Sequence, residues 1–280
     1  MKVGFTLPQF GGQAAQGAQI GRFAGAAEEL GASGLWVADR LLVPVAPAAG
    51  YAGGAGFPPV FRRALDPLVV LAAAAVATTS IRLGTNVLSA PWYPPALLAR
   101  TALSLDVISG GRFVLGLGVG WCAEEFAAVG VPPAERGDRL DECLEVLHQW
   151  WTAEPVQHTG KVSEIPPAHV DLKPHGIPLY LGAFSGRGLR RLTRWGAGWL
   201  PVVAAGQSLE RVTRHWDALG RVPAVLRIAV PEGTSLDTIS ETLDAAAGAG
   251  FEEAFVELVH VADDVDAALD MVAAVLRRSA

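Results

Sequence analysis

The sequence is poor in cysteine, and its basic residues never gather into a run. Its 280 residues include only Cys122 and Cys143, too few for a disulfide framework and typical of a protein in a reducing cytoplasm. The net charge of -6 and the scattered Lys and Arg residues argue against nucleic acid and anionic membranes as partners. The N-terminal segment lacks the features of a signal peptide, and the longest apolar run, residues 68–77, would span roughly half a bilayer. We therefore expect a cytoplasmic protein.

Several motifs of metal and nucleophilic catalysis are also missing. The six histidines show no H-x-H or H-E-x-x-H spacing, so we expect no metal site. The chain also lacks a G-x-S-x-G motif, which would place a serine nucleophile on a sharp turn after a strand.

Short apolar runs alternate with helical patterns from one end of the chain to the other. The runs rarely alternate with polar residues, which is typical of parallel strands buried on both faces. We expect strands at 3–7, 35–38, 81–87, 113–117, 178–182, 198–202, 225–230 and 254–258. We expect helices near 18–31, 66–78, 94–108, 138–152, 186–195, 207–219, 235–248 and 263–278. Eight strand–helix repeats predict an α/β fold, a single (β/α)8 TIM barrel that forms one domain over residues 1–280.

Two connections are too long for simple turns. Residues 40–65 follow the second strand, and residues 153–177, which include a candidate hairpin, precede the fifth strand. Insertions of this length in a compact barrel are usually lids or binding loops. The first insertion follows a strand, so we expect it on the catalytic face at the C-terminal ends of the strands.

Candidate binding groups stand at these strand ends. Asp39 and Arg40 follow the second strand, where they either contact a ligand or form a strand-end salt bridge. The glycines of segment 116–120 let a ligand approach the backbone, or they form a turn that needs small residues. Segment 181–188 opens a helix, and its Ser185 and Arg187 favour an anion site over a plain capping turn.

Aromatic residues on the same face suit a pocket for a planar ring. We expect Trp92, Tyr93 and Trp121 in a substrate pocket, and Tyr51 beside them. His260 is the one histidine at a predicted strand end.

Four long segments together resemble the luciferase-like monooxygenase superfamily, and most closely its actinobacterial branch of deazaflavin (coenzyme F420)-dependent oxidoreductases. These segments are GASGLWVADRLLVP (31–44), DPLVVLAAAAVATTSIRLGTNVLSAPWYPPALLART (66–101), LDVISGGRFVLGLGVGWCAEEFAAVGVPPAERG (105–137) and IPLYLGAFSGRGLRRLTRWGAGWLPV (177–202). The resemblance implies a cofactor held over the C-terminal strand ends, with a non-proline cis peptide at Asn86–Val87. The implied cofactor-binding residues are Asp39, Asn86, Val87, Ser89, Gly120, Phe184, Ser185, Arg187 and Gly188.

Two positions depart from the sugar-phosphate dehydrogenases of that branch. Those enzymes have His where this chain has Arg40, and a catalytic Glu where it has Trp121. The departures argue against sugar-phosphate oxidation and suggest a more apolar or an anionic substrate.

The resemblance implies an F420-dependent oxidoreductase that transfers a hydride between reduced deazaflavin and an activated C=C, C=N or C=O bond of a small molecule. Arg40, Tyr51 and His260 are the catalytic candidates. His260 is the favoured proton donor because an imidazole exchanges protons near neutral pH, whereas a guanidinium stays charged. The alternatives are an FMNH2-dependent monooxygenase supplied by a separate cofactor-reducing enzyme, and a non-catalytic flavin- or deazaflavin-binding protein. The resemblance also implies a homodimer.

Overall fold

The computed structural model describes residues 1–51 and 56–279. Its strands are β1 (Lys2–Thr6), β2 (Gly34–Val37), β3 (Arg82–Thr85), β4 (Leu88–Ser89), β5 (Phe113–Gly118), β6 (Val156–Thr159), β7 (Glu164–Ala168), β8 (Leu179–Leu181), β9 (Gly198–Trp199), β10 (Val202–Ala204), β11 (Val225–Ala229) and β12 (Glu253–Val256). Its helices are α1 (Gly11–Ala15), α2 (Ile20–Glu29), α3 (Pro67–Ala77), α4 (Pro95–Ile108), α5 (Ala123–Ala128), α6 (Arg136–Thr152), α7 (Gly186–Trp195), α8 (Glu210–Ala218), α9 (Leu236–Gly248) and α10 (Val265–Ser279). Within this described part, none of the helices combines the length and apolar character needed to cross a membrane.

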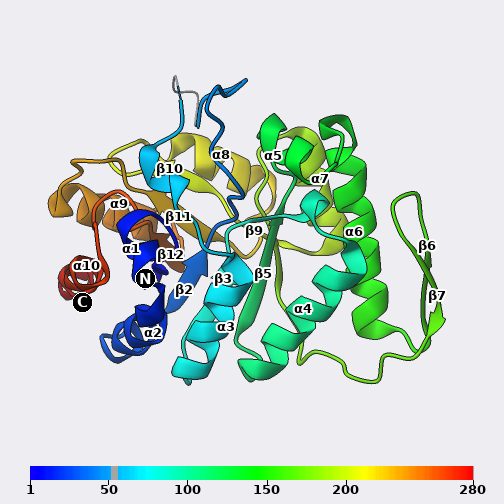
Figure 1. Cartoon of the computed structure of the whole chain (residues 1–280). Coiled ribbons are helices and arrows are strands. Elements are labelled where there is room, and N and C mark those ends of the chain that lie inside the picture. Colours follow the sequence, from blue (N-terminus) through cyan, green and yellow to red (C-terminus); the bar gives the residue numbers. More distant parts are fainter. Residues whose placement is uncertain (52–55, 280) are drawn as a thin grey trace.

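A curled parallel sheet forms the centre of the molecule (Figure 1). Its strands follow the order β10-β11-β12-β1-β2-β3-β5-β8-β9, and β4 pairs with β5. The two ends of this path, β9 and β10, are separated in the chain only by Leu200 and Pro201. Trp199 of β9 also forms a parallel bridge with Ala224, just before β11. The α/β fold with a parallel sheet, expected from the buried apolar runs, is confirmed.

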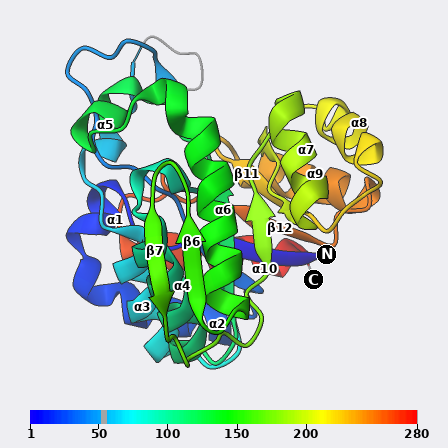
Figure 2. The same cartoon turned by 90° about the vertical axis from the view of Figure 1, so that its right-hand side faces the viewer.

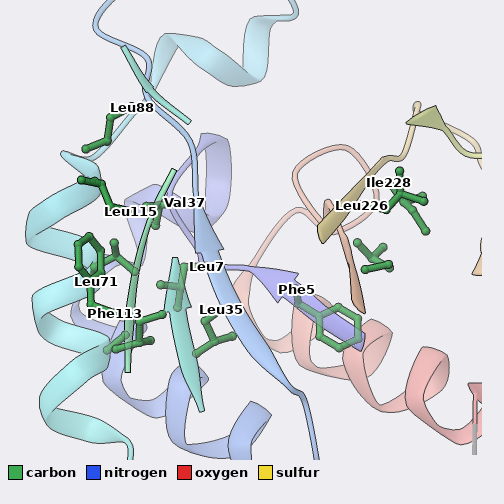
Figure 3. Packing of buried hydrophobic residues seen from close by; sticks show 14 of the residues in the cluster. Phe5, Leu7, Leu35, Val37, Leu71, Leu88, Phe113, Leu115, Leu226 and Ile228 are labelled. Carbon is green, nitrogen blue, oxygen red and sulfur yellow. The ribbon is translucent and has the colours of Figure 1, made fainter. Parts of the chain in front are cut away.

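Apolar side chains fill both sides of this sheet. Outside it, residues such as Leu35 of β2 and Leu71 of α3 are completely buried between strands and helices (Figure 3). A second cluster includes Trp36 and Phe255, whose rings stack with centroids 5.0 Å apart. The Trp36 ring occupies the space beside Gly84, because a Cβ there would lie 2.3 Å from a ring carbon.

The helix boundaries follow local signals in the sequence. The Asp66 carboxylate caps α3 by accepting hydrogen bonds from the backbone N–H groups of Leu68 and Val69, at 2.9 and 3.0 Å. Gly31 and Gly110 have φ values of 93° and 67°, the left-handed conformation that ends a helix most easily at glycine. These glycines lie just after α2 and α4, which are the first and third of the helices expected from the sequence.

Some elements differ from the sequence-based expectation. The expected strand 81–87 is shortened to β3, and the separate strand β4 follows it. The expected strand 198–202 is interrupted at residues 200–201, between β9 and β10. The sequence pattern also missed the short helices α1 and α5. Between β2 and α3, the described residues contain the 3-10 helix η3 (Pro59–Arg62), while part of the expected lid, residues 52–55, lies outside the described residues. The second long connection forms the antiparallel hairpin β6–β7, which lies against α6 (Figure 2).

Candidate functional site

A cavity of about 350 Å³ lies where the C-terminal ends of several parallel strands meet. The segment after β2 and the short helix α5 stand over this end of the sheet, on the upper side of Figure 1. Residues that follow β1, β2, β3, β5, β8 and β12 line the cavity together with Arg227 of β11, as the topology of a parallel barrel predicts. The sequence-predicted residues among them are Asp39, Arg40, Tyr51, Asn86, Val87, Ser89, Trp92, Gly120 and Trp121.

Asp39 is a buried carboxylate at the wall of this cavity. Its Oδ2 accepts hydrogen bonds from the backbone N–H of Ser89, at 2.9 Å, and from the hydroxyl of Tyr93, at 3.0 Å. Burial raises the pKa of Asp39 to about 6, and these two hydrogen bonds only partly oppose the shift. Asp39 can therefore hold a proton or a negative charge close to neutral pH.

The turn between β3 and β4 carries the predicted cis peptide at Asn86–Val87, and that prediction is confirmed. The Val87 side chain lies over two glycines of the neighbouring strands. A Cβ at Gly118 or Gly182 would approach this side chain to 2.6 or 2.9 Å, so the position of Val87 requires bare backbone on both strands. This packing explains two of the glycines that line the cavity.

Three lining residues hold buried donors without an acceptor among the described residues. They are Asn86, with its Nδ2, Trp92, with its Nε1, and Arg227, with its Nε. A buried unpaired donor costs about 1–3 kcal/mol, which a ligand with suitable acceptors would recover. A planar ring that carries carbonyl oxygens and ring nitrogens, as flavins and deazaflavins do, fits this donor set.

Arg40 lies at the cavity wall between a carboxylate and several aromatic rings. Its Nη1 donates to Glu125 Oε2 at 3.0 Å, and the two side chains are only 9% and 1% exposed. The guanidinium carbon also lies 5.2 to 5.9 Å from the centroids of four aromatic rings, those of Tyr51, Phe57, Phe61 and Trp121. Sequence analysis allowed Arg40 a ligand contact or a strand-end salt bridge, and the structure shows a salt bridge to Glu125.

A second buried ion pair, which the sequence analysis missed, joins Arg227 of β11 to Glu257. Arg227 Nη2 donates to Glu257 Oε1 at 2.5 Å and lies 3.4 Å from the hydroxyl of Tyr51. Burial alone would lower the pKa of Arg227, but the adjacent Glu257 carboxylate outweighs burial and raises that pKa above its usual range. One signal was present in the sequence, because Arg227 is the single charged residue of the apolar segment VLRIA.

A smaller cavity of about 120 Å³ adjoins the first and reaches the N-terminus of α7. Phe184, Ser185 and Gly188 line it, as predicted for an anion site. The Ser185 hydroxyl caps α7 by accepting from the N–H of Gly188 at 3.2 Å. The two cavities share Val119 and Gly182 as common wall residues.

Arg187, which was predicted to belong to this anion site, points elsewhere. It lines neither cavity, is 58% exposed, and donates to Asp138 at 2.5 Å. The guanidinium that lines the smaller cavity belongs to Arg191, one helical turn later, which the sequence analysis did not select. Arg191 itself binds the carboxylate of Asp141 through two hydrogen bonds of 2.6 and 2.9 Å.

Two further predicted residues lie outside the main cavity. Tyr93 binds Asp39 from a neighbouring cavity of about 280 Å³, so it supports the acid instead of lining the expected substrate pocket. His260 is not among the lining residues, and its ring packs edge-on against Phe61 at a centroid distance of 5.6 Å. Among the described residues, no group of three or more His, Cys, Asp or Glu is placed to hold a metal ion.

Comparison with curated proteins gives relatives over most of the chain. An uncharacterised protein of Mycobacterium tuberculosis is 31% identical over 216 residues, which cover 73% of this chain and 76% of that protein. An F420-dependent glucose-6-phosphate dehydrogenase of Amycolatopsis mediterranei is 28% identical over 251 residues, 87% of this chain and 68% of that enzyme.

Solved structures with the same fold align along nearly the whole chain. Monooxygenase RslO1 of Streptomyces bottropensis superposes with a TM-score of 0.76 at 19% identity, covering 99% of this chain and 97% of that one. The oxygenating constituent of 3,6-diketocamphane monooxygenase of Pseudomonas putida, in complex with FMN, gives 0.75 at 16% identity and the same coverage. The family model for luciferase-like monooxygenases matches residues 1–278. The chain therefore belongs to the luciferase-like monooxygenase family.

Proposed function

We propose that this protein is an F420-dependent oxidoreductase that transfers a hydride between reduced deazaflavin and an activated C=C, C=N or C=O bond of a small molecule. The observation that supports the proposal most directly is the pair of cavities that share Val119 and Gly182. The larger one suits a planar ring, and the smaller one ends at the N-terminus of α7, where the positive end of the helix dipole favours an anion. A cofactor with a ring and a phosphate-bearing tail has both parts.

The residues at the larger cavity have separate tasks in this proposal. When bound, the cofactor supplies the hydride acceptor or donor carbon. Asp39, Asn86 and Gly120 would hold the ring, the last through its backbone, which has the left-handed conformation with a φ of 70°. The substrate carbon takes up the hydride, and the atom next to it, or the carbonyl oxygen, takes up a proton.

Tyr51 is the residue best placed to manage that proton. It lines the cavity, and Arg227 lies 3.4 Å from its hydroxyl oxygen, where a cation stabilises a developing phenolate. His260, which the sequence favoured for this role, is absent from the lining. Arg40 also lines the cavity, but a guanidinium does not release a proton.

FMN is the alternative cofactor. The relatives include an enzyme described as F420-dependent and a fold neighbour in complex with FMN, so the family accommodates both groups. We favour deazaflavin because the sequence segments quoted above resemble the F420-dependent branch.

A titration of the purified protein with oxidised F420 and with FMN tests this proposal. We expect saturable F420 binding, followed anaerobically by oxidation of reduced F420 when a conjugated carbonyl such as cinnamaldehyde is added. Binding of FMN alone, with oxygen-dependent product, would replace the proposal with a monooxygenase. Tight binding without turnover over a panel of C=C, C=N and C=O compounds would indicate a cofactor-binding protein.

A further inference from the structure

The charged side chains around the larger cavity bear on which substrates it can bind. Among the described lining residues, the cationic side chains are Arg40 and Arg227, and the carboxylic ones are Asp39, Glu125 and Glu257. Each guanidinium is bonded to a carboxylate, Arg40 to Glu125 at 3.0 Å and Arg227 to Glu257 at 2.5 Å. An anionic substrate would therefore meet no uncompensated cation on this wall.

Arg40 is the cation that an anionic substrate would need, because Arg227 is bonded to Glu257 and also donates to the hydroxyl of Tyr51. Glu125 holds Arg40 in a fixed place. Its Oε1 also accepts from the backbone N–H groups of Leu41 and Leu42, at 2.8 and 3.3 Å. A carboxylate this close cancels most of the guanidinium field in a partly desolvated site.

The rings around Arg40 form a wall suited to flat, uncharged molecules. Phe57 and Trp121 stack with centroids 5.4 Å apart and an interplanar angle of 13°, and Tyr51 contacts both. Trp121 is 44% exposed and lines the cavity, so one part of this stack remains open to a ligand. Aromatic pairs in offset or edge geometry add stabilisation beyond the burial of their area.

We infer that the cavity selects neutral, planar, conjugated acceptors over anionic ones, and that Glu125 enforces this selection by neutralising Arg40. The identity of the reaction rests on the function proposed above, whereas the selection itself is a property of binding. Glu125 is thus a specificity-determining residue that acts through Arg40. The pairing of Glu125 with Arg40 also explains how the cavity wall can contain an arginine without favouring substrates that carry a carboxylate or a phosphate.

A matched pair of ligands tests this selection. Cinnamamide and cinnamate have nearly the same shape and conjugation, but only cinnamate carries a charge at neutral pH. We would measure the Kd of each by isothermal titration calorimetry, with and without saturating oxidised F420. The wild-type protein should bind cinnamamide at least tenfold more tightly than cinnamate.

Glu125→Gln is the informative variant. The glutamine oxygen still accepts from Leu41 and Leu42, but the negative charge beside Arg40 is gone, so the preference for cinnamamide should shrink at least tenfold. Glu124→Gln is the control, since Glu124 binds the backbone N–H of Ala48 at 2.6 Å and lies outside the cavity lining. It removes the same charge one residue away and should keep the wild-type preference.

Several results would overturn the inference. One is equal or tighter binding of cinnamate than of cinnamamide by the wild-type protein. Another is an unchanged preference for cinnamamide in the folded Glu125→Gln variant, and a further one is no measurable binding of either compound. Loss of the preference in Glu124→Gln as well would assign it to general charge and also reject the role of Glu125. Failure of F420 to bind, with the selection intact, would reject only the proposed function.

Discussion

The hydroxyl of Tyr93 donates a 3.0 Å hydrogen bond to Oδ2 of Asp39 at the wall of the larger cavity. Burial raises the pKa of Asp39 to about 6, and burial together with Asp39 raises the pKa of Tyr93. The tyrosine therefore remains a donor, and it orients the carboxylate from the side away from the main cavity. Burial destabilises the ionised form of Asp39, and Tyr93 fixes the position of its carboxyl group. Shifted pKa values of this kind are common at functional sites.

Asp39→Asn should make the protein more stable at pH 8. The pKa of Asp39 is higher in the folded protein than its ordinary value of 3.8, so charged Asp39 costs folding free energy above pH 6, up to about 3 kcal/mol. The gain should fade as the pH falls from 6 towards 4, because the wild-type residue becomes protonated. Urea unfolding at pH 8 and pH 4 measures this difference.

Asp171→Asn is the matched control, because Asp171 is exposed and should show no such gain. Under the proposed function, Asp39→Asn should also bind F420 less tightly even though it unfolds less readily. A variant that is less stable than wild type at pH 8 would contradict the assigned cost of burying Asp39.

Gly188→Ala should weaken cofactor binding more than tenfold. Gly188 lines the smaller cavity, and a Cβ there would lie 2.7 Å from the Cβ of Ala183, so the added methyl narrows the expected phosphate site. Gly186→Ala is the control, since a Cβ at that position meets only Arg190 Nη1, at 3.6 Å. Fluorescence titration with F420 gives the affinities, and thermal unfolding shows that both variants fold. If Gly188→Ala and Gly186→Ala bound F420 with equal affinity, the phosphate site would have to lie elsewhere.

Arg187→Ala adds a second comparison at the same helix. The guanidinium pairs with Asp138 on the surface, so we expect F420 affinity to stay within about twofold of wild type. A tenfold loss would restore the role that the sequence alone suggested for Arg187.

The parts of the site that could be predicted from the sequence are those whose position is set by the nearby strand or helix. Asp39 and Asn86 follow buried strands, and Ser185 precedes a helix, so their places at one edge of the sheet follow from topology. Gly188 lies in the first turn of the same helix and was predicted for the same reason.

The missed or misplaced features depend on contacts that are distant in the chain. The carboxylate that binds Arg40 comes from Glu125, 85 residues later and on a short helix with no clear sequence pattern. The direction of Arg187 depends on the acidic residues of α6, which the sequence does not place beside α7. Arg227 is charged yet lies within an apolar strand, and its partner Glu257 follows a different strand, 30 residues later in the chain.

Glu257→Gln should lower the free energy of unfolding by about 3 kcal/mol, the scale for removing one partner of a buried ion pair. The Arg227 and Glu257 side chains are 19% and 8% exposed, so water replaces the lost carboxylate poorly. Glu252→Gln, the same substitution at an exposed site nearby, should change stability by less than about 0.5 kcal/mol. Urea unfolding at pH 7 compares them, and equal small effects would mean that Arg227 is well solvated.

The last prediction concerns the proton that accompanies hydride transfer. Tyr51 lines the cavity and has Arg227 at 3.4 Å from its hydroxyl, whereas His260 packs against Phe61 outside the lining. Tyr51→Phe removes only the hydroxyl and keeps the ring that Arg40 contacts, so the aromatic wall should remain. With reduced F420 and a conjugated carbonyl, kcat should fall by about 10²-fold, the contribution typical of a general acid.

His260→Asn should leave kcat within about twofold of wild type, since its ring contacts Phe61 and not the cavity. The KM for the carbonyl compound separates the two roles of Tyr51. An unchanged KM with a reduced kcat indicates proton transfer, whereas a raised KM alone would mean that the hydroxyl only positions the substrate. A large fall in His260→Asn with little change in Tyr51→Phe would return the role of proton donor to the histidine, despite its distance from the lining.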